Sequence, residues 1–164
     1  MTRVYEVRVE AEIAAPPEAL WARVADHEGT PSWVDAVKAV TIVREGQGRT
    51  GLGAVRVVAF KPRLWTTISE EITFFDPPHE FRYVLFKGMP GLHSHLGKII
   101  VDDLGGDRSR LRWEVDFVFR SFHPFRPFVP SFGRSFEAVL ADGVATLKRQ
   151  LEGDRTTAAS RGPA

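Results

Sequence analysis

The chain contains no cysteine among its 164 residues. This absence excludes disulfide bonds, a thiolate nucleophile and any metal site built on cysteine ligands. A strong charge of one sign is also missing, because the formal net charge is only +1 at pH 7. With neither a large positive charge nor a long basic run, the sequence argues against nucleic acid as a partner.

Long apolar runs are absent as well. No segment approaches the roughly 18 apolar residues that span a bilayer, so we expect no stable membrane insertion. The first residues, MTRVYEVRVE, alternate charged and apolar side chains and lack the apolar centre of a signal peptide, which predicts a cytoplasmic protein. The sequence also lacks G-x-G-x-x-G, P-loop, G-x-S-x-G and H-E-x-x-H motifs, so no cofactor is expected.

Composition and length predict one globular domain. Hydrophobic residues make up 43% of the chain and charged residues 26%, which is ordinary for a globular protein that buries a core. We assign residues 1–152 to this domain. Residues 153–164 have no apolar anchor and are predicted to form a disordered tail. The sequence leaves open whether the protein is a monomer or a homodimer.

Most of the chain has the two-residue alternation of β-strands. Residues 4–13 alternate strictly between apolar and charged side chains, which predicts a strand with one wet face. Short turns rich in glycine and proline separate the later strands, so neighbouring strands should pair antiparallel. Six further strands are expected at residues 38–44, 53–60, 65–75, 80–87, 94–103 and 110–119.

Helical patterns occur at three places. Residues 131–151 have apolar side chains at helical spacing and predict one long amphipathic helix, with Ser131 as its N-cap and Gly153 just beyond its end. Gly143 lies on its apolar side, where the missing side chain leaves room for close helix packing or for a ligand. Two short helices are expected after the first strand, one at residues 18–26 and one that begins at Pro31 and contains Trp33.

Between the last strand and the long helix, residues 121–130 read SFHPFRPFVP. The prolines exclude a helix or a central strand there. The phenylalanines need a partner, which is most simply the domain's own core. A pocket lid, a dimer contact and a lipid-docking surface are the alternatives.

This order of elements resembles the helix-grip fold of the START-like (SRPBCC) superfamily. Local features also match over about residues 3–152, namely PPEALWARVAD, the following P-S-W, GLGAVRV, EEITFFDPP and WEVDF. Within the superfamily the chain is most similar to the polyketide cyclase/dehydrase and lipid-transport branch. The resemblance implies an α+β fold, in which a curved, seven-stranded antiparallel sheet wraps around the long C-terminal helix and encloses a deep apolar cavity.

Strand alternation indicates which side chains face this cavity. Ile68, Glu70, Ile72 and Phe74 share one face of the fourth strand, and their apolar character points that face inward. Counting through the turns pairs Ile72 with Tyr83 and Phe74 with Phe81, and Ile99 with Trp113 and Val101 with Leu111 in the last hairpin. One row across four strands then contains Glu70, Leu85, His95 and Phe117.

The row suggests three catalytic candidates, Glu70, His95 and Tyr83. Glu70 and His95 are two strands apart, so their β-carbons should lie on the order of 10 Å from each other. A carboxylate and an imidazole can act as general base and acid on a ketone, and Tyr83 can donate a hydrogen bond to a carbonyl. The structural alternative is that Glu70 pairs with an arginine or a backbone amide. Arg56 is the nearest arginine, but alternation places it on the face opposite Val55 and Val57, so we expect pairing only through a bulge or an edge twist.

A metal is not expected at the H-x-H pair of His93 and His95. The two side chains should share a strand face, but only Glu70 is near enough to be a third ligand, and H-x-H alone is a weak signal.

Two functions follow from the resemblance and the cavity wall. The first is binding of a hydrophobic small molecule, lipid-like or polycyclic and polyketide-like, in the cavity. The second is catalysis as a polyketide aromatase/cyclase or dehydratase, with proton transfer by Glu70, His95 and Tyr83. A stress-related or ribosome-binding role is a third alternative, against which the small net charge argues. The predicted ligand contacts are Trp33, Ile72, Leu85, Trp113, Phe117, Phe136, Leu140 and Gly143.

Overall fold

The computed structural model describes residues 4–61, 67–120 and 129–160. Seven strands and three helices occupy these ranges. In chain order they are β1 (Val4–Ile13), α1 (Pro17–Val24), the 3-10 helix η1 (His27–Ser32), β2 (Val37–Arg44), β3 (Val55–Phe60), β4 (Thr67–Asp76), β5 (Glu80–Lys87), β6 (Leu92–Gly105), β7 (Arg108–Phe119) and α2 (Val129–Ser160).

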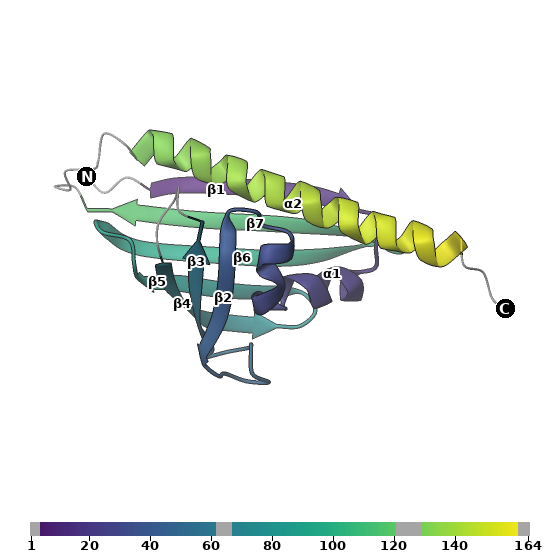
Figure 1. Cartoon of the computed structure of the whole chain (residues 1–164), viewed down its shortest axis with the longest axis horizontal. Helices are drawn as coiled ribbons and strands as arrows, with labels where there is room; N and C mark the ends of the chain where they lie inside the picture. The colour runs from purple at the N-terminus through teal and green to yellow at the C-terminus, as the bar shows by residue number, and fades with distance from the viewer. Residues whose placement is uncertain (1–3, 62–66, 121–128, 161–164) are drawn as a thin grey trace.

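Within the described residues, the strands form one antiparallel sheet in the order β1-β7-β6-β5-β4-β3-β2. The predicted α+β helix-grip fold is confirmed. Figure 1 shows α2 lying along β1 and β7, while β2 and β3 run across the direction of those strands because the sheet curves. The short helix η1 packs on β2, whereas α1 packs on β6 and β7. None of the helices in the described part of the chain is long and apolar enough to cross a membrane.

The predicted register is confirmed at most positions that were derived from the turns. Glu70 pairs with Leu85 and Ile72 with Tyr83, and the β6–β7 pairs of His95, Ile99 and Val101 are as expected. The pairing of Phe74 with Phe81 is wrong. A register shift between Ile72 and Phe74 places Phe75 opposite Phe81 and leaves Phe74 39% exposed.

A second register shift separates His93 from His95. It lies between Leu92 and Ser94 on β6. His93 is exposed while His95 is buried, so the two side chains do not share a face as predicted. The described residues contain no group of three acidic or histidine side chains that could hold a metal ion.

The helix α2 differs from its predicted ends. It begins at Val129, which places Pro130 in the first turn, where a proline is tolerated, and leaves Ser131 inside the helix instead of at the cap. It continues to Ser160, so the expected disorder is wrong for residues 153–160, and residues 161–164 lie outside the described part. Gly153 does not end the helix. Glu152, on one side of Gly153, accepts a hydrogen bond from the Ala14 N–H at 3.0 Å. Asp154, on the other side, lies 4.0 Å from Arg23. These two contacts hold this part of the helix against the rest of the fold.

The apolar side of α2 covers the core as its spacing predicted. Leu140, Val144, Leu147 and Leu151 are buried. At Gly143 a β-carbon would lie 3.1 Å from Val34 Cγ2, so the glycine allows the helix to pack closely on the segment that follows η1. The predicted second short helix is displaced, since η1 spans His27–Ser32 and ends before Trp33.

Candidate functional site

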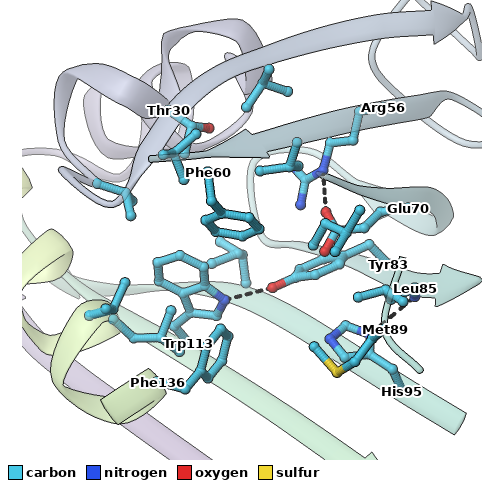
Figure 2. A pocket seen from close by; sticks show the side chains of 18 of the residues that line it. Thr30, Arg56, Phe60, Glu70, Tyr83, Leu85, Met89, His95, Trp113 and Phe136 are labelled. Carbon is cyan, nitrogen blue, oxygen red and sulfur yellow. Dashed lines mark hydrogen bonds and ion pairs between the residues drawn. The ribbon is translucent and has the colours of Figure 1, made fainter. Parts of the chain in front are cut away.

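A cavity lies between the sheet and α2. Its volume is about 90 Å³, counted as the space open to the centres of water molecules, and one water needs only ~10–15 Å³ of such space. Figure 2 shows side chains from β3 to β7 and from α2 converging on it. The predicted ligand contacts that line it are Trp33, Leu85, Trp113, Phe117, Phe136 and Leu140.

Two predicted contacts are not part of the cavity wall that the described residues form. Ile72 is 1% exposed and belongs to the closed core, in which the neighbouring Phe81 packs against Trp21 of α1 and His27 of η1. Gly143 faces Val34 and Trp33, so the space of its missing side chain is filled by protein. The predictions for the proline-rich segment (core packing, a lid, a dimer contact or lipid docking) concern residues 121–128, which lie outside the described part.

Glu70 points inward as predicted, but it is paired. Its Oε2 accepts a hydrogen bond from Arg56 Nε at 2.8 Å, and both side chains are at most 10% exposed. Arg56 and Glu70 are direct partners on β3 and β4, and no bulge separates them. The expectation that pairing needs a bulge or an edge twist is wrong, because Arg56, and not its neighbours Val55 and Val57, shares the cavity face with Glu70. Arg56 and Val58 both line the cavity.

His27 extends this ion pair into a buried network that the sequence did not predict. The His27 side chain is fully buried, and its Nδ1 accepts from Arg56 Nη1 at 2.9 Å while its Nε2 donates to the Thr50 carbonyl at 3.0 Å. Burial and, to a smaller extent, the Arg56 charge lower the pKa of His27 to about 3. His27 is therefore neutral near pH 7, and it holds one side of the guanidinium while Glu70 holds another.

Tyr83 is fixed beside this network. Its hydroxyl oxygen accepts from Trp113 Nε1 at 2.8 Å, as Figure 2 shows. The Arg56 guanidinium lies 4.6 Å from the centre of the Tyr83 ring, a cation–π distance. Burial, and then the Glu70 charge, raise the pKa of Tyr83 well above its usual value, so the phenol keeps its proton.

The Tyr83 ring lies over Gly97, its partner on β6. A β-carbon at Gly97 would fall 2.1 Å from Tyr83 Cζ, which is closer than atoms can approach. The glycine within the strand therefore makes room for the aromatic ring, a common reason for glycine in a strand interior.

His95 lies next to Tyr83, with ring centres 5.6 Å apart. Its Nδ1 accepts the backbone N–H of Leu85 at 3.1 Å, so the proton of the neutral ring is assigned to Nε2. Burial lowers the pKa of His95, which favours the neutral ring. Leu85 and His95 are therefore close, as predicted, because the Leu85 N–H bonds to the His95 ring. The backbone pairing of β5 with β6 does not reach them, since it ends at the pair Tyr83 and Gly97.

The structure therefore brings the three predicted catalytic residues to one wall. It adds Arg56, which the sequence suggested only as a badly placed partner for Glu70, and His27, which sequence reasoning missed. Arg56 carried a signal, because a lone arginine in the apolar strand VRVVAF must either face water or have a buried partner. His27 carried none, since it lies in the segment of residues 27–31, which reads as a helix break.

Comparison with known proteins agrees with this architecture. The family described as polyketide cyclase/dehydrase and lipid transport matches residues 5–152. No curated protein sequence matches the chain. Among solved structures, a START superfamily protein from Mycobacterium smegmatis is 19% identical with a TM-score of 0.72, and the alignment covers 89% of this chain and 98% of that one.

Two similar structures are those of enzymes. Norcoclaurine synthase from Thalictrum flavum is 17% identical with a TM-score of 0.70, over 94% of this chain and 98% of that one. The Zhui aromatase/cyclase from Streptomyces sp. R1128 is 21% identical with a TM-score of 0.69, over 93% of each chain. At these identities the structures show the shared fold alone. Because the family match covers nearly the whole sequence, the protein belongs to the polyketide cyclase/dehydrase and lipid transport family.

Proposed function

We propose that the protein binds a hydrophobic small molecule, lipid-like or polyketide-like, in the cavity between the sheet and α2. The observation that carries this proposal is a mainly apolar cavity with few polar groups, of which Tyr83 and His95 are kept neutral by burial. Apolar walls with a small number of oriented polar groups are the usual composition of small-molecule sites. The family assignment supports a fold that binds hydrophobic ligands.

The polar groups favour a ligand that carries a carbonyl oxygen. The Tyr83 hydroxyl accepts from Trp113, so its own hydrogen is left to donate. His95 accepts from Leu85 at Nδ1 and presents an Nε2–H. Both groups are neutral, and both line the cavity. Two adjacent neutral donors suit a ketone or ester oxygen on an apolar frame.

Binding is favoured over proton transfer by Glu70. A carboxylate that acts as a general base must take up a proton, which would weaken its 2.8 Å bond to Arg56. Breaking a buried ion pair in this way is costly. Glu70 therefore serves as the partner that keeps Arg56 in place.

The proposal is tested by native mass spectrometry of freshly purified protein, followed by organic extraction. We expect a retained apolar molecule in near-stoichiometric amount. Val139→Trp places a large side chain in the cavity wall and should abolish retention. Val43→Trp, at a position 58% exposed on β2, is the matched control and should retain the ligand. Empty wild-type protein, or equal retention by both variants, would contradict binding in this cavity.

Catalysis as a cyclase or dehydratase is the second candidate, favoured by the adjacency of Tyr83 and His95. Their two donors can polarise one ketone and assist loss of water. Heptane-2,6-dione tests this directly, because its intramolecular aldol condensation yields 3-methylcyclohex-2-enone and one water. A catalyst should accelerate this reaction and lose the acceleration in Tyr83→Phe and His95→Gln. No acceleration by the wild type leaves the binding protein as the better description.

A further inference from the structure

The Glu70 carboxylate uses only one of its two oxygens in contacts with the described residues. Oε2 accepts from Arg56 Nε at 2.8 Å, whereas no described residue donates to Oε1. Among the described residues, the Trp33 indole nitrogen is the one unpaired side-chain nitrogen or oxygen that is also closed off by its surroundings. Glu70 Oε1 is therefore unpaired but still open. Because Glu70 is 5% exposed and lines the cavity, this oxygen opens into the cavity.

Oε1 lies in the part of the cavity that contains the polar donors. Figure 2 shows the second oxygen of Glu70 beside the Tyr83 ring. Burial raises the pKa of Tyr83 and lowers that of His95, and the Glu70 charge, the next influence on each, raises both. The carboxylate is thus close enough to act on both side chains. Tyr83, His95 and Arg56 present donors to the cavity, and Glu70 presents an acceptor.

An open carboxylate oxygen in a mainly apolar cavity restricts what can bind beside it. A buried polar atom without a hydrogen bond costs free energy. Water can supply the bond to Oε1 when no ligand is bound. A ligand that displaces this water with an apolar group loses the bond and therefore affinity, whereas a ligand with a donor of its own replaces it.

The charges of the polar wall distinguish between an uncharged and a cationic donor. Glu70 and Arg56 carry opposite charges and are in direct contact. The pKa of His27 and that of His95 are lowered by burial, so both rings are neutral, and Tyr83 keeps its proton. The wall therefore has no net charge. An ammonium group would add an uncompensated charge beside the Arg56 guanidinium, whereas a hydroxyl adds none.

We propose that the ligand is uncharged and carries a hydroxyl group that donates a hydrogen bond to Glu70 Oε1. This inference rests on the proposed binding function and narrows its ligand class to apolar molecules that combine a hydroxyl with the carbonyl favoured by Tyr83 and His95. The hydroxyl keeps its proton in this arrangement. The Oε2 bond to Arg56 is then undisturbed, which agrees with the role of Glu70 as the partner of Arg56.

The test compares four probes on one naphthalene frame, by isothermal titration calorimetry of the full-length protein at pH 7. 2-Naphthol can donate, 2-methoxynaphthalene can only accept, 2-methylnaphthalene can do neither, and 2-(aminomethyl)naphthalene is a cation. We expect 2-naphthol to bind about ten- to hundredfold more tightly than the methoxy and methyl compounds, the range for a hydrogen bond to a charged group. The cation should bind more weakly than 2-naphthol.

Glu70→Gln tests whether this oxygen is the acceptor. With the amide oxygen turned to Arg56, the side chain presents an NH₂ donor where Oε1 was. The variant should bind 2-naphthol no more tightly than 2-methoxynaphthalene. Glu71→Gln is the matched control, because Glu71 is the next residue on β4 and pairs with Arg44 at 2.8 Å on the exposed side. It should keep the wild-type preference.

A second variant serves where Glu70→Gln folds poorly. Arg56→Met combined with Glu70→Leu replaces the buried pair by apolar side chains of similar volume. It should bind 2-methylnaphthalene and lose the preference for 2-naphthol. Arg44→Met combined with Glu71→Leu makes the same exchange in the exposed pair and should behave as the wild type.

The outcomes separate the two proposals. If the wild type binds the methyl or methoxy compound as tightly as 2-naphthol, or binds the cation most tightly, the hydroxyl inference is overturned while the binding function stands. A preference for 2-naphthol that survives the loss of the Glu70 carboxylate overturns it as well, because the hydroxyl then binds elsewhere. If none of the four probes binds, both proposals are overturned.

Discussion

Gly97 shows how one missing side chain positions the cavity's phenol. The Tyr83 ring occupies the space where any larger residue would place its β-carbon. In the same way Arg56 has its place because His27 and Glu70 each hold a different nitrogen of its guanidinium. Single residues of this kind fix the polar side of the cavity, and two predictions follow from their surroundings.

Gly97→Ala should force Tyr83 out of its position. We expect the free energy of unfolding to fall by about 1–3 kcal/mol, as in other overpacked cores. Urea denaturation measures this loss. Gly153→Ala is the same substitution in α2 with no atom within 4 Å of the new carbon, and it should stabilise the protein by up to ~1 kcal/mol through helix propensity. Equal effects of the two substitutions would contradict the packing argument.

His27 should make the protein sensitive to acid. Its pKa is about 3 in the fold and 6.5 when unfolded, so the unfolded chain binds the proton first as pH falls. The stabilisation is complete above about pH 6.5 and is lost progressively toward pH 3, by ~1.4 kcal/mol per pH unit between the two values. His95, whose pKa is also lowered, adds a loss in the same direction.

The measurement compares urea unfolding at pH 7 and pH 5. Wild-type protein should lose about 2 kcal/mol more than His27→Gln over this interval, because glutamine can both donate and accept without titrating. An identical pH dependence in the two proteins would show that His27 is not the responsible group.

At the scale of elements, local sequence determines which face of α2 is buried, whereas tertiary contacts accompany its C-terminal extension. Its apolar spacing was sufficient to predict the buried face. Its C-terminal end was not predictable from Gly153, because contacts from Glu152 to Ala14, just after β1, and from Asp154 to Arg23 of α1 accompany the continuation of the helix. The register shifts in β4 and β6 were also not predictable from local sequence, since counting residues from the turns assumes that strand pairing is regular.

Glu152 should therefore contribute to stability beyond its helix propensity. Glu152→Ala removes the acceptor of the half-buried Ala14 N–H at the end of β1. We expect a loss of roughly 1 kcal/mol, the net value of such a hydrogen bond. Glu137→Ala, at an exposed position of the same helix, is the control and should change the unfolding midpoint little. A similar effect at both positions would contradict the docking role.

At the scale of the whole molecule, the Arg56 network joins parts of the chain that are far apart in sequence. His27 of η1, Arg56 of β3 and Glu70 of β4 meet in one buried cluster. The strand pattern predicted the antiparallel strands and the inward position of Glu70, because alternation encodes faces, and the order of elements predicted the helix-grip fold through its resemblance to a known superfamily. It did not predict the cluster, since a charged residue is placed inward only when its partners, contributed by other elements, are already known.

Arg56→Met should be strongly destabilising, by about 3–5 kcal/mol, because it leaves the Glu70 carboxylate buried and unpaired. Adding Glu70→Leu should recover much of that loss, since an apolar pair of similar volume often replaces a buried ion pair well. A double-mutant cycle by chemical denaturation measures the coupling. Additive losses would mean that the two residues act independently.

The bond between the Leu85 N–H and His95 gives the molecule an internal reporter. An ordinary strand amide bonds to a carbonyl that no physiological pH change can alter, whereas this amide bonds to a ring nitrogen that loses its lone pair when protonated. Because the same imidazole lines the cavity, we expect hydrogen exchange at this one backbone amide to change when His95 is protonated or when a ligand binds beside it. Filling of the cavity should then be measurable as the exchange rate of a single amide in the sheet.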